Sequence, residues 1–275
     1  MKKIRIIILP VLLLGMIVMI YAGYRLIETK QVYKEGNTAY EGLSNQVRKT
    51  TAVNDRTSSQ TQAVELAEEF AVSEYSKLQM AEEGRPKIYI PEFEIDFDLL
   101  KTINDDSVAW LYGPDTEIDY PVMKAADYNY YISHLPDGTS NANGALFIDY
   151  NNSPDFSDRL TVIYGHHMKS GRMFGSLVGY KNQGYYNENP YMYLYTQQMN
   201  YRIDLMYGCV IDAGQWSERA FMYEENIGSL IEYAKQNTTF ESGVEYKEGD
   251  RVVALSTCSY EFDEARYVVL GILAS

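Results

Sequence analysis

Cysteine and histidine are scarce in this 275-residue chain, which contains two cysteines, Cys209 and Cys258, and three histidines. Two cysteines permit at most one disulfide, which excludes a disulfide-rich scaffold. The chain has no His-Glu-x-x-His or Cys-x-x-Cys spacing and no glycine-rich phosphate loop. The sequence therefore gives no reason to expect a metal site, a nucleotide site or a cofactor.

Basic residues are outnumbered by acidic ones, with 24 Lys and Arg against 38 Asp and Glu, and the formal net charge is −14. A surface of this sign repels a phosphate backbone, so the charge argues against nucleic acid as a partner. It favours solubility of the folded part, and it says little about the substrate.

Charge is missing altogether from residues 6–24, an apolar run long enough for a helix to cross a bilayer. Three basic residues precede this run, which predicts that residues 1–5 stay in the cytoplasm. A cleavable signal peptide is the alternative, but its apolar region usually covers only about 7 to 15 residues. We therefore expect a single-pass signal anchor at 6–24, with the rest of the chain outside the cell membrane.

Composition divides the remaining chain into three parts. Residues 25–60 are polar and glycine-containing, which predicts a stalk. Apolar residues then recur near helical spacing among glutamates, which predicts an amphipathic helix over 61–86, ended by glycine and proline. This helix either packs against the folded domain or serves as a spacer. We expect residues 87–275 to form the folded domain.

Within that domain, short runs of β-branched and aromatic residues alternate with turn signals. The candidate strands include residues 121–124, 144–149, 160–164, 201–211, 251–258 and 266–270. Residues 214–236 interrupt them with a helical pattern between two late strands. We predict a mainly β fold, a closed antiparallel barrel with an N-terminal helix and a helical insertion between late strands.

A thiol and a guanidinium are predicted to share one face of the last hairpin. Side chains alternate along a strand, so Cys258 at the end of one strand and Arg266 at the start of the next can face the same side. A fixed positive charge favours the thiolate and can hold a developing oxyanion. The alternative for Cys258 is a small, inert core residue, which is the role we expect of Cys209. We expect both thiols to be free.

Two of the three histidines, His166 and His167, follow an apolar strand that ends at Gly165. A cysteine nucleophile needs an acid/base partner from a distant part of the chain, and an imidazole supplies it. Because adjacent residues on a strand point to opposite sides, only one of the two imidazoles is expected to face the thiol.

These segments resemble the sortases, the cysteine transpeptidases of Gram-positive bacteria, and most closely class B. The resemblance rests on residues 164–169 (YGHHMK), 255–262 (LSTCSYEF) and 265–269 (ARYVV). Further similar segments are 103–106 (INDD), 109–111 (AWL), 118–122 (IDYPV) and 144–150 (GALFIDY). The similarity covers about residues 88–275 and implies a sortase-type barrel.

The resemblance implies specific roles. Cys258 would attack a peptide bond of a sorting signal on a secreted protein and form a thioacyl intermediate, which an amine acceptor, such as a peptidoglycan precursor, would resolve. His166, directly after the glycine, would be the acid/base, and Arg266 would stabilise the oxyanion. His167 would be a supporting or surface residue.

The resemblance also assigns substrate-binding positions to Tyr164, Ser256 and Asn129. The first two lie two residues before His166 and Cys258, which places each on the strand face of its catalytic neighbour. Two rival functions stay open at this point. One is a surface cysteine peptidase that uses water as the acceptor, and the other is an extracellular binding module that kept the barrel and lost the chemistry.

Overall fold

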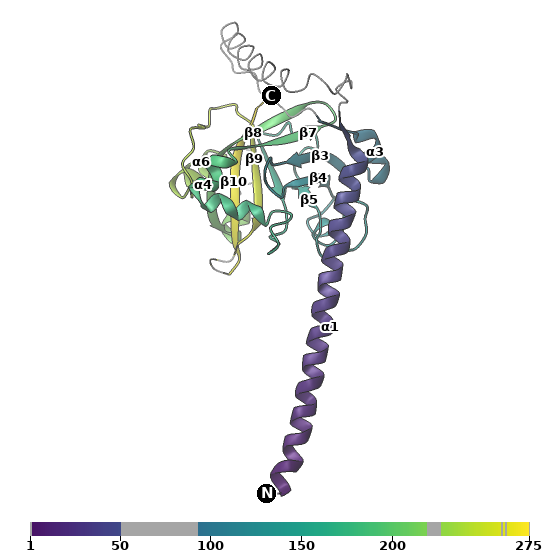
Figure 1. Ribbon diagram of the computed structural model, residues 1–275. Coiled ribbons are helices and arrows are strands. Elements are labelled where there is room, and N and C mark those ends of the chain that lie inside the picture. The colour runs from purple at the N-terminus through teal and green to yellow at the C-terminus, as the bar shows by residue number, and fades with distance from the viewer. Residues whose placement is uncertain (1, 51–92, 219–226, 260, 262, 275) are drawn as a thin grey trace, which may run out of the picture.

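The structure is a computed structural model, in which residues 2–50, 93–218, 227–259, 261 and 263–274 are described, with the backbone alone described for 2–13 and 50. The predicted helix at 61–86 lies outside the described residues. The described part contains a closed barrel and one long helix that runs past it (Figure 1).

The barrel has eight strands within the described residues. They are β3 (Ser107–Tyr112), β4 (Asp119–Lys124), β5 (Leu146–Ile148), β6 (Leu160–Tyr164), β7 (Tyr191–Thr196), β8 (Asn200–Asp212), β9 (Val252–Cys258) and β10 (Ala265–Ala274). Their spatial order is β10-β8-β7-β3-β4-β5-β6-β9. The predicted closed, mainly β barrel is confirmed.

The barrel is not antiparallel throughout, which corrects one detail of the prediction. The β4–β5 and β6–β9 pairs run parallel, whereas the other neighbours are antiparallel. Parallel strands need a crossover of about a dozen residues or more. The segments at 125–145 and 165–251 provide this length.

Alternation along β9 separates the inside of the barrel from its outside. Val253 and Leu255 pack in the interior core together with Val269 of β10. Val252 and Ala254 instead belong to an outer core cluster. Every second residue of β9 therefore faces outward, and Ser256 and Cys258 continue that outward series.

The outer cluster is formed by the insertion between β8 and β9. This insertion contains α5 (Ala213–Glu218) and α6 (Ile227–Gln236), as the helical pattern predicts. Trp216 of α5 and Leu230 of α6 are buried in the same cluster as outward residues of β8, β9 and β10, and both helices contact β8. Figure 1 shows α6 on the side of the barrel where β8, β9 and β10 lie. The insertion thereby makes the outward face of β9 a second packed layer.

Shorter elements complete the described fold. They are β1 (Arg48–Thr50), β2 (Phe93–Ile95), α3 (Phe97–Ile103), η1 (Tyr130–Ile132), η2 (Ser176–Lys181) and α4 (Gln183–Glu188). The Asp96 side chain caps α3 by accepting a hydrogen bond from the Leu99 N–H at 3.0 Å. β1 and β2 form a two-stranded sheet that joins the end of the long helix to α3.

The long helix α1 (Lys2–Val47) occupies most of the region where we expected a polar stalk. Gly36, Tyr40, Leu43 and Val47 recur at helical spacing on one face of α1 and are buried. The Tyr40 hydroxyl donates to the Gly144 carbonyl at 2.5 Å. Residues 25–47 therefore differ from the expectation because a narrow apolar stripe, interrupted by glycines, docks the helix on the barrel.

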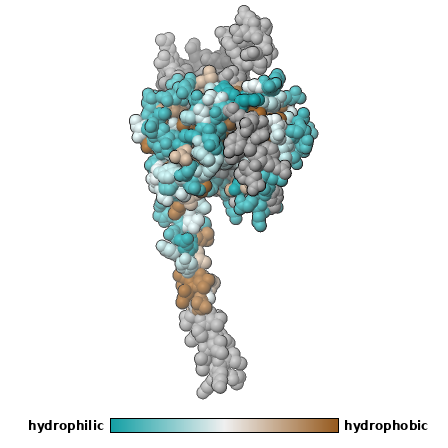
Figure 2. Space-filling model, turned by 180° about the vertical axis from the view of Figure 1, so that it is seen from behind, coloured by the Kyte–Doolittle hydropathy of each residue, from teal (hydrophilic) through white to brown (hydrophobic). Residues whose placement is uncertain are grey.

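The amino-terminal half of α1 projects away from the barrel (Figure 1). Figure 2 shows a hydrophobic surface on this projecting part. Its exposed apolar side chains include Leu14, Ile17, Met19, Ile20 and Ile27. Among the described residues, no helix meets the length and hydropathy required of a membrane span.

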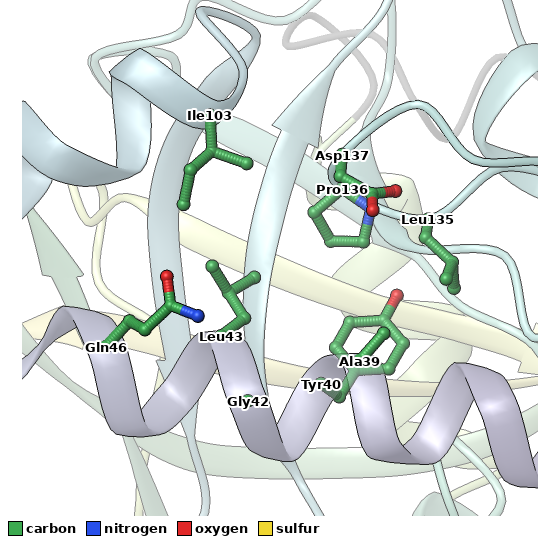
Figure 3. A pocket seen from close by; sticks show the side chains of 9 residues that line it. All are labelled: Ala39, Tyr40, Gly42, Leu43, Gln46, Ile103, Leu135, Pro136 and Asp137. Atoms are coloured by element: carbon green, nitrogen blue, oxygen red, sulfur yellow. The ribbon is translucent and has the colours of Figure 1, made fainter.

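A cavity of about 350 Å³ lies between α1 and the barrel. Figure 3 shows Tyr40 and Leu43 extending from α1 toward Ile103 and the loop of residues 135–137. Tyr40 is buried and hydrogen-bonded at this site. The packing of α1 is therefore tight along its buried stripe and loose beside it.

Candidate active site

The hairpin of β9 and β10 places Cys258 directly opposite Arg266. Side chains of directly opposed residues have Cβ atoms about 4.5 to 5.5 Å apart, on the same face of the sheet. This register agrees with the alternation argument made from the sequence. The thiol is free, and Cys258 is exposed.

A cavity of about 200 Å³ opens over this face. It is lined by Tyr128, Ile132, Ala145, Phe147, Tyr164, Gly165, His166, Ser256, Thr257, Cys258 and Arg266. All three predicted catalytic residues therefore line one cavity, although His166 is separated from Arg266 by a hundred positions. The predicted substrate residues Tyr164 and Ser256 line it too.

The end of β6 delivers the imidazole to this cavity. β6 and β9 are parallel neighbours, with Tyr164 paired to Ser256. The Gly165 N–H donates to the Ser256 carbonyl at 3.2 Å, and the Thr257 hydroxyl donates to the Gly165 carbonyl at 2.8 Å. These bonds hold the two strand ends side by side, so the residues that follow, His166 and Cys258, lie at the same end of the barrel.

The hydrogen bonds of the two histidines define their tautomers. His166 Nε2 lies 2.6 Å from the Ile132 carbonyl oxygen, and because a carbonyl only accepts, Nε2 carries a proton and donates it. When His166 is neutral, its Nδ1 is therefore the basic nitrogen. His167 Nδ1 donates in the same way to the backbone carbonyl of Cys258, at 2.8 Å. His167 thus contacts the backbone of the cysteine residue.

Arg266 is held by its own strand and loop. Its Nη1 donates to the Ala265 carbonyl at 3.2 Å, and its Nη2 lies 3.6 Å from a carboxylate oxygen of Glu264. The Ser259 N–H donates to the same Ala265 carbonyl at 2.8 Å. That N–H is therefore engaged, which leaves the guanidinium as the cationic donor that faces the cavity.

Tyrosines close one side of the cavity around a buried carboxylate. Asp149 is almost fully buried and accepts hydrogen bonds from the hydroxyls of Tyr128, at 2.5 Å, and Tyr164, at 3.2 Å. Burial, followed by the charge of Asp149, raises the pKa of Tyr164 well above its ordinary value. Tyr164 therefore stays protonated and acts as a wall and a hydrogen-bonding group.

Ser256 adds a polar atom to the lining of this cavity. The residue is 1% exposed, and its hydroxyl oxygen has no hydrogen-bond partner among the described residues. An unpaired buried hydroxyl costs about 1 to 3 kcal/mol. A ligand group that pairs with it would recover that energy, which makes Ser256 a ready contact for a polar substrate atom.

Asn129 is the one predicted site residue that the structure does not bring into the cavity. It is exposed and immediately precedes η1, where its N–H donates to the Asp127 carboxylate at 2.7 Å. Its neighbour Tyr128 and the later Ile132 line the cavity instead. The sequence singled out the correct segment, but the 3-10 turn that sets which side chains face inward has no clear sequence signal.

A polar cluster fixes the chain immediately after Cys258. Lys181 of η2 donates to the Ser259 hydroxyl at 2.9 Å and forms an ion pair with Glu261, which also accepts from Ser259. Burial acts to raise the pKa of Glu261, but the hydrogen bonds from Lys181 and Ser259 outweigh it and lower that pKa. No local sequence pattern indicates this cluster, because Lys181 lies far from the cysteine in the chain.

The second cysteine is separate from the site. Cys209 of β8 is 1% exposed in the outer core cluster, and burial raises the pKa of its thiol to about 12. Both thiols are free, as expected. Within the described residues, no three His, Cys, Asp or Glu side chains are grouped closely enough to hold a metal ion.

Comparisons with known proteins agree with this geometry. The family model "Sortase domain" matches residues 111–274. Sortase B of Listeria monocytogenes is 32% identical over 180 residues, which cover 64% of this chain and 73% of that protein. Sortase B of Staphylococcus aureus is 23% identical over 200 residues, covering 72% and 82% of the two chains.

Solved structures show the same similarity. A mutant form of Clostridium perfringens sortase B superposes with a TM-score of 0.61 at 26% identity, covering 66% of this chain and 87% of that one. A class B sortase of Streptococcus pyogenes involved in pilus biogenesis superposes with a TM-score of 0.58 at 27% identity, covering 64% and 97%.

Proposed function

The chain belongs to the sortase family and is a class B cysteine transpeptidase, and from this premise we propose that Cys258, His166 and Arg266 are its catalytic residues. The observation that carries the proposal is the single cavity lined by all three side chains. The substrate is a sorting signal on a secreted protein, and the acceptor is an amine, such as that of a peptidoglycan precursor.

The first half of the reaction acylates the enzyme. The Cys258 thiolate attacks the scissile carbonyl carbon, and a C–S bond forms while the carbonyl oxygen becomes an oxyanion facing Arg266. The C–N bond then breaks, and the leaving amine takes a proton from the His166 imidazolium. Because the neutral ring is basic at Nδ1, the proton released by the thiol has a defined position on His166.

The second half transfers the acyl group. The acceptor amine attacks the thioester carbon, His166 removes a proton from the amine nitrogen, and the C–S bond breaks to restore the thiolate. Water in place of the amine would yield a free carboxylate, which is the peptidase alternative. A catalytically silent binding module is disfavoured, since a module would not need an exposed free thiol opposite a guanidinium.

A peptide screen tests the proposed activity. The full-length protein, purified in detergent, is incubated with a library of quenched fluorescent pentapeptides, with and without triglycine as the amine. We expect cleavage of a restricted set of peptides, a thioacyl adduct on Cys258 by mass spectrometry, and an amide product only when triglycine is present. Products that contain a free carboxylate under all conditions would reject transpeptidation. Unchanged turnover in Cys258→Ala would exclude the nucleophile.

We further propose that residues 6–24 anchor the protein in the cell membrane with the barrel outside. The uncharged sequence of this segment and the exposed apolar side chains between Leu14 and Ile27 on the projecting part of α1 support the proposal. In intact cells, a thiol reagent that does not cross membranes should label Cys258. Labelling only after cell lysis would place the site on the inner side and contradict the proposed orientation.

A further inference from the structure

A second cavity, of about 440 Å³, also borders His166. It is lined by Tyr33, Asn37, Ala142, His166, His167, Met168, Lys169 and Ser170. His166 also lines the Cys258 cavity, and His167 donates to the Cys258 carbonyl. The two cavities therefore share the proposed general base, His166, in their linings.

One wall of this second cavity is the helix α1, and polar contacts fix it there. Asn143 is fully buried, and its amide donates to the Tyr33 carbonyl at 3.4 Å and to the Asn37 side chain at 3.1 Å. Asn141 donates to the Val32 carbonyl at 3.0 Å. This segment of α1 is therefore held against the loop that precedes β5, at the height of the histidines.

The chemistry of the lining suits an amine that must lose its charge. None of the lining residues is a carboxylate, whereas Lys169 supplies a cation and the imidazoles of His166 and His167 are close by. A nearby positive charge lowers the pKa of an incoming ammonium, because like charges disfavour the charged form. The neutral amine, which is the nucleophilic form, is thereby favoured next to His166.

The same lysine can recognise an anion on the acceptor. Lys169 is exposed, and none of the ion pairs found among the described residues involves it. A carboxylate attached to the amine-bearing molecule would pair with this ammonium while the amine points toward His166. The lining therefore distinguishes a peptide-like amine that carries a free carboxylate from a simple amine.

We propose that the cavity between α1 and residues 166–170 is the acceptor site, and that Lys169 binds a carboxylate of the acceptor. The inference rests on the proposed transpeptidation. In this arrangement the amine nitrogen enters from the α1 side, gives one proton to His166, and forms the new C–N bond with the thioester carbon in the Cys258 cavity. The resulting tetrahedral oxyanion then collapses, the C–S bond breaks, and its electron pair returns to sulfur.

The position of the cavity on α1 suits an acceptor that is itself held at a membrane. An α-helix rises about 1.5 Å per residue, so Tyr33 and Asn37 lie about 14 to 20 Å along the axis from the end of the uncharged run at Tyr24. The acceptor site thus lies next to Val32, where α1 already contacts Asn141 of the barrel region. A short tether would be long enough to reach it.

The test compares triglycine with triglycinamide, which lacks the carboxylate, as acceptors for the full-length protein. The donor is the peptide found in the screen above. We expect triglycine to have the lower KM. Lys169→Gln should raise the KM for triglycine about two- to five-fold, the range of an exposed ion pair, and abolish the preference over the amide. The rate of Cys258 acylation by the donor should not follow this change.

Matched variants separate binding from structure. Lys34→Gln removes a lysine from the exposed side of α1 outside this cavity and should leave both KM values unchanged. Ala142→Trp, which narrows the cavity, should reduce transfer to both amines more than it reduces acylation. Equal KM values for the two amines in the wild type, or a parallel fall in acylation and transfer in Lys169→Gln, would overturn the proposal.

A binding measurement tests the acceptor site separately from the transpeptidase activity. Ligand-observed NMR with the Cys258→Ala protein and no donor should detect triglycine binding that weakens in the Lys169→Gln background. If triglycine bound but the wild type formed no amide product, the proposed transpeptidation would be refuted and the proposed acceptor site would still hold. The absence of both binding and any effect of Lys169→Gln would refute the site, even if transfer were observed.

Discussion

Two glycines on α1 provide a sharp test of how this helix docks on the barrel. A Cβ at Gly42 would meet no atom within 4 Å. A Cβ at Gly36 would lie 2.5 Å from Asn143 Nδ2 and 2.8 Å from Asn141 Oδ1. The same chemical change, Gly→Ala, should therefore have opposite effects on the free energy of unfolding at positions six residues apart on one helix.

The magnitudes follow from the two environments. Gly42→Ala should stabilise the protein by about 0.5 to 1 kcal/mol, because alanine loses less backbone entropy in a helix. At Gly36 the same gain is opposed by overpacking, which costs about 1 to 3 kcal/mol. Displacing Asn143 would also weaken its hydrogen bonds to Tyr33 and Asn37, at about 0.5 to 1.5 kcal/mol each. Gly36→Ala should therefore destabilise by about 1 to 5 kcal/mol.

Thermal unfolding of the full-length variants measures the difference. One kcal/mol shifts Tm by about 2 to 4 °C in a protein of this size. We expect Gly42→Ala to raise Tm by about 1 to 4 °C and Gly36→Ala to lower it by several degrees. If both substitutions raised Tm equally, α1 would behave as an isolated helix governed by propensity alone. The docking described here, and the acceptor cavity that depends on it, would then be refuted.

Three further predictions concern the active site. Arg266→Lys keeps the positive charge but loses the planar guanidinium with its paired N–H groups. It should lower kcat/KM for the sorting-signal peptide by about 100-fold or more, as the loss of a hydrogen-bond donor to an oxyanion does. Kinetics equal to those of the wild type would contradict the role assigned to Arg266. Because burial raises the pKa of Cys209 to about 12, iodoacetamide at pH 8 should alkylate only Cys258 in the folded protein, and a second modified cysteine in the mass spectrum would contradict the structure. Lys181→Met should raise the lowered pKa of Glu261. A carboxylate with a lowered pKa stabilises above its unfolded pKa and loses that contribution as pH falls through the folded pKa. The variant should therefore have a lower Tm than the wild type at pH 7, by the equivalent of less than about 1 kcal/mol for this partly exposed pair, and the same Tm in acid. A Tm difference that grows as the pH falls would contradict this prediction.

Local patterns were sufficient to predict several elements and one half of the candidate site. Alternation along the last two strands predicts that Cys258 and Arg266 share a face, and the register confirms it. The helical pattern at 214–236 corresponds to α5 and α6. Such features depend on neighbours within about ten residues, so the sequence contains the information directly.

The parts that local patterns missed depend on packing between distant segments. The glycines Gly36 and Gly42 in a polar segment suggested a stalk, yet a Cβ added at Gly36 would lie only 2.5 Å from Asn143 Nδ2, so the helix packs closely against the barrel region there. The sequence alone does not distinguish a glycine that allows close packing from a glycine that makes the backbone flexible. Lys181 likewise shows its role only because η2 lies beside the chain that follows Cys258.

The parallel pairing of β6 with β9 explains how the distant imidazole reaches the thiol. Tyr164 is aligned with Ser256, so two residues further along each strand, at the same end of the barrel, the chain reaches His166 and Cys258. An antiparallel pairing of the same strands would have sent these residues to opposite ends. The sequence predicts each strand and each chemical group, but it does not state the relative direction of strands separated by the long 165–251 crossover. The candidate site therefore depends on that crossover as much as on the residues that line it.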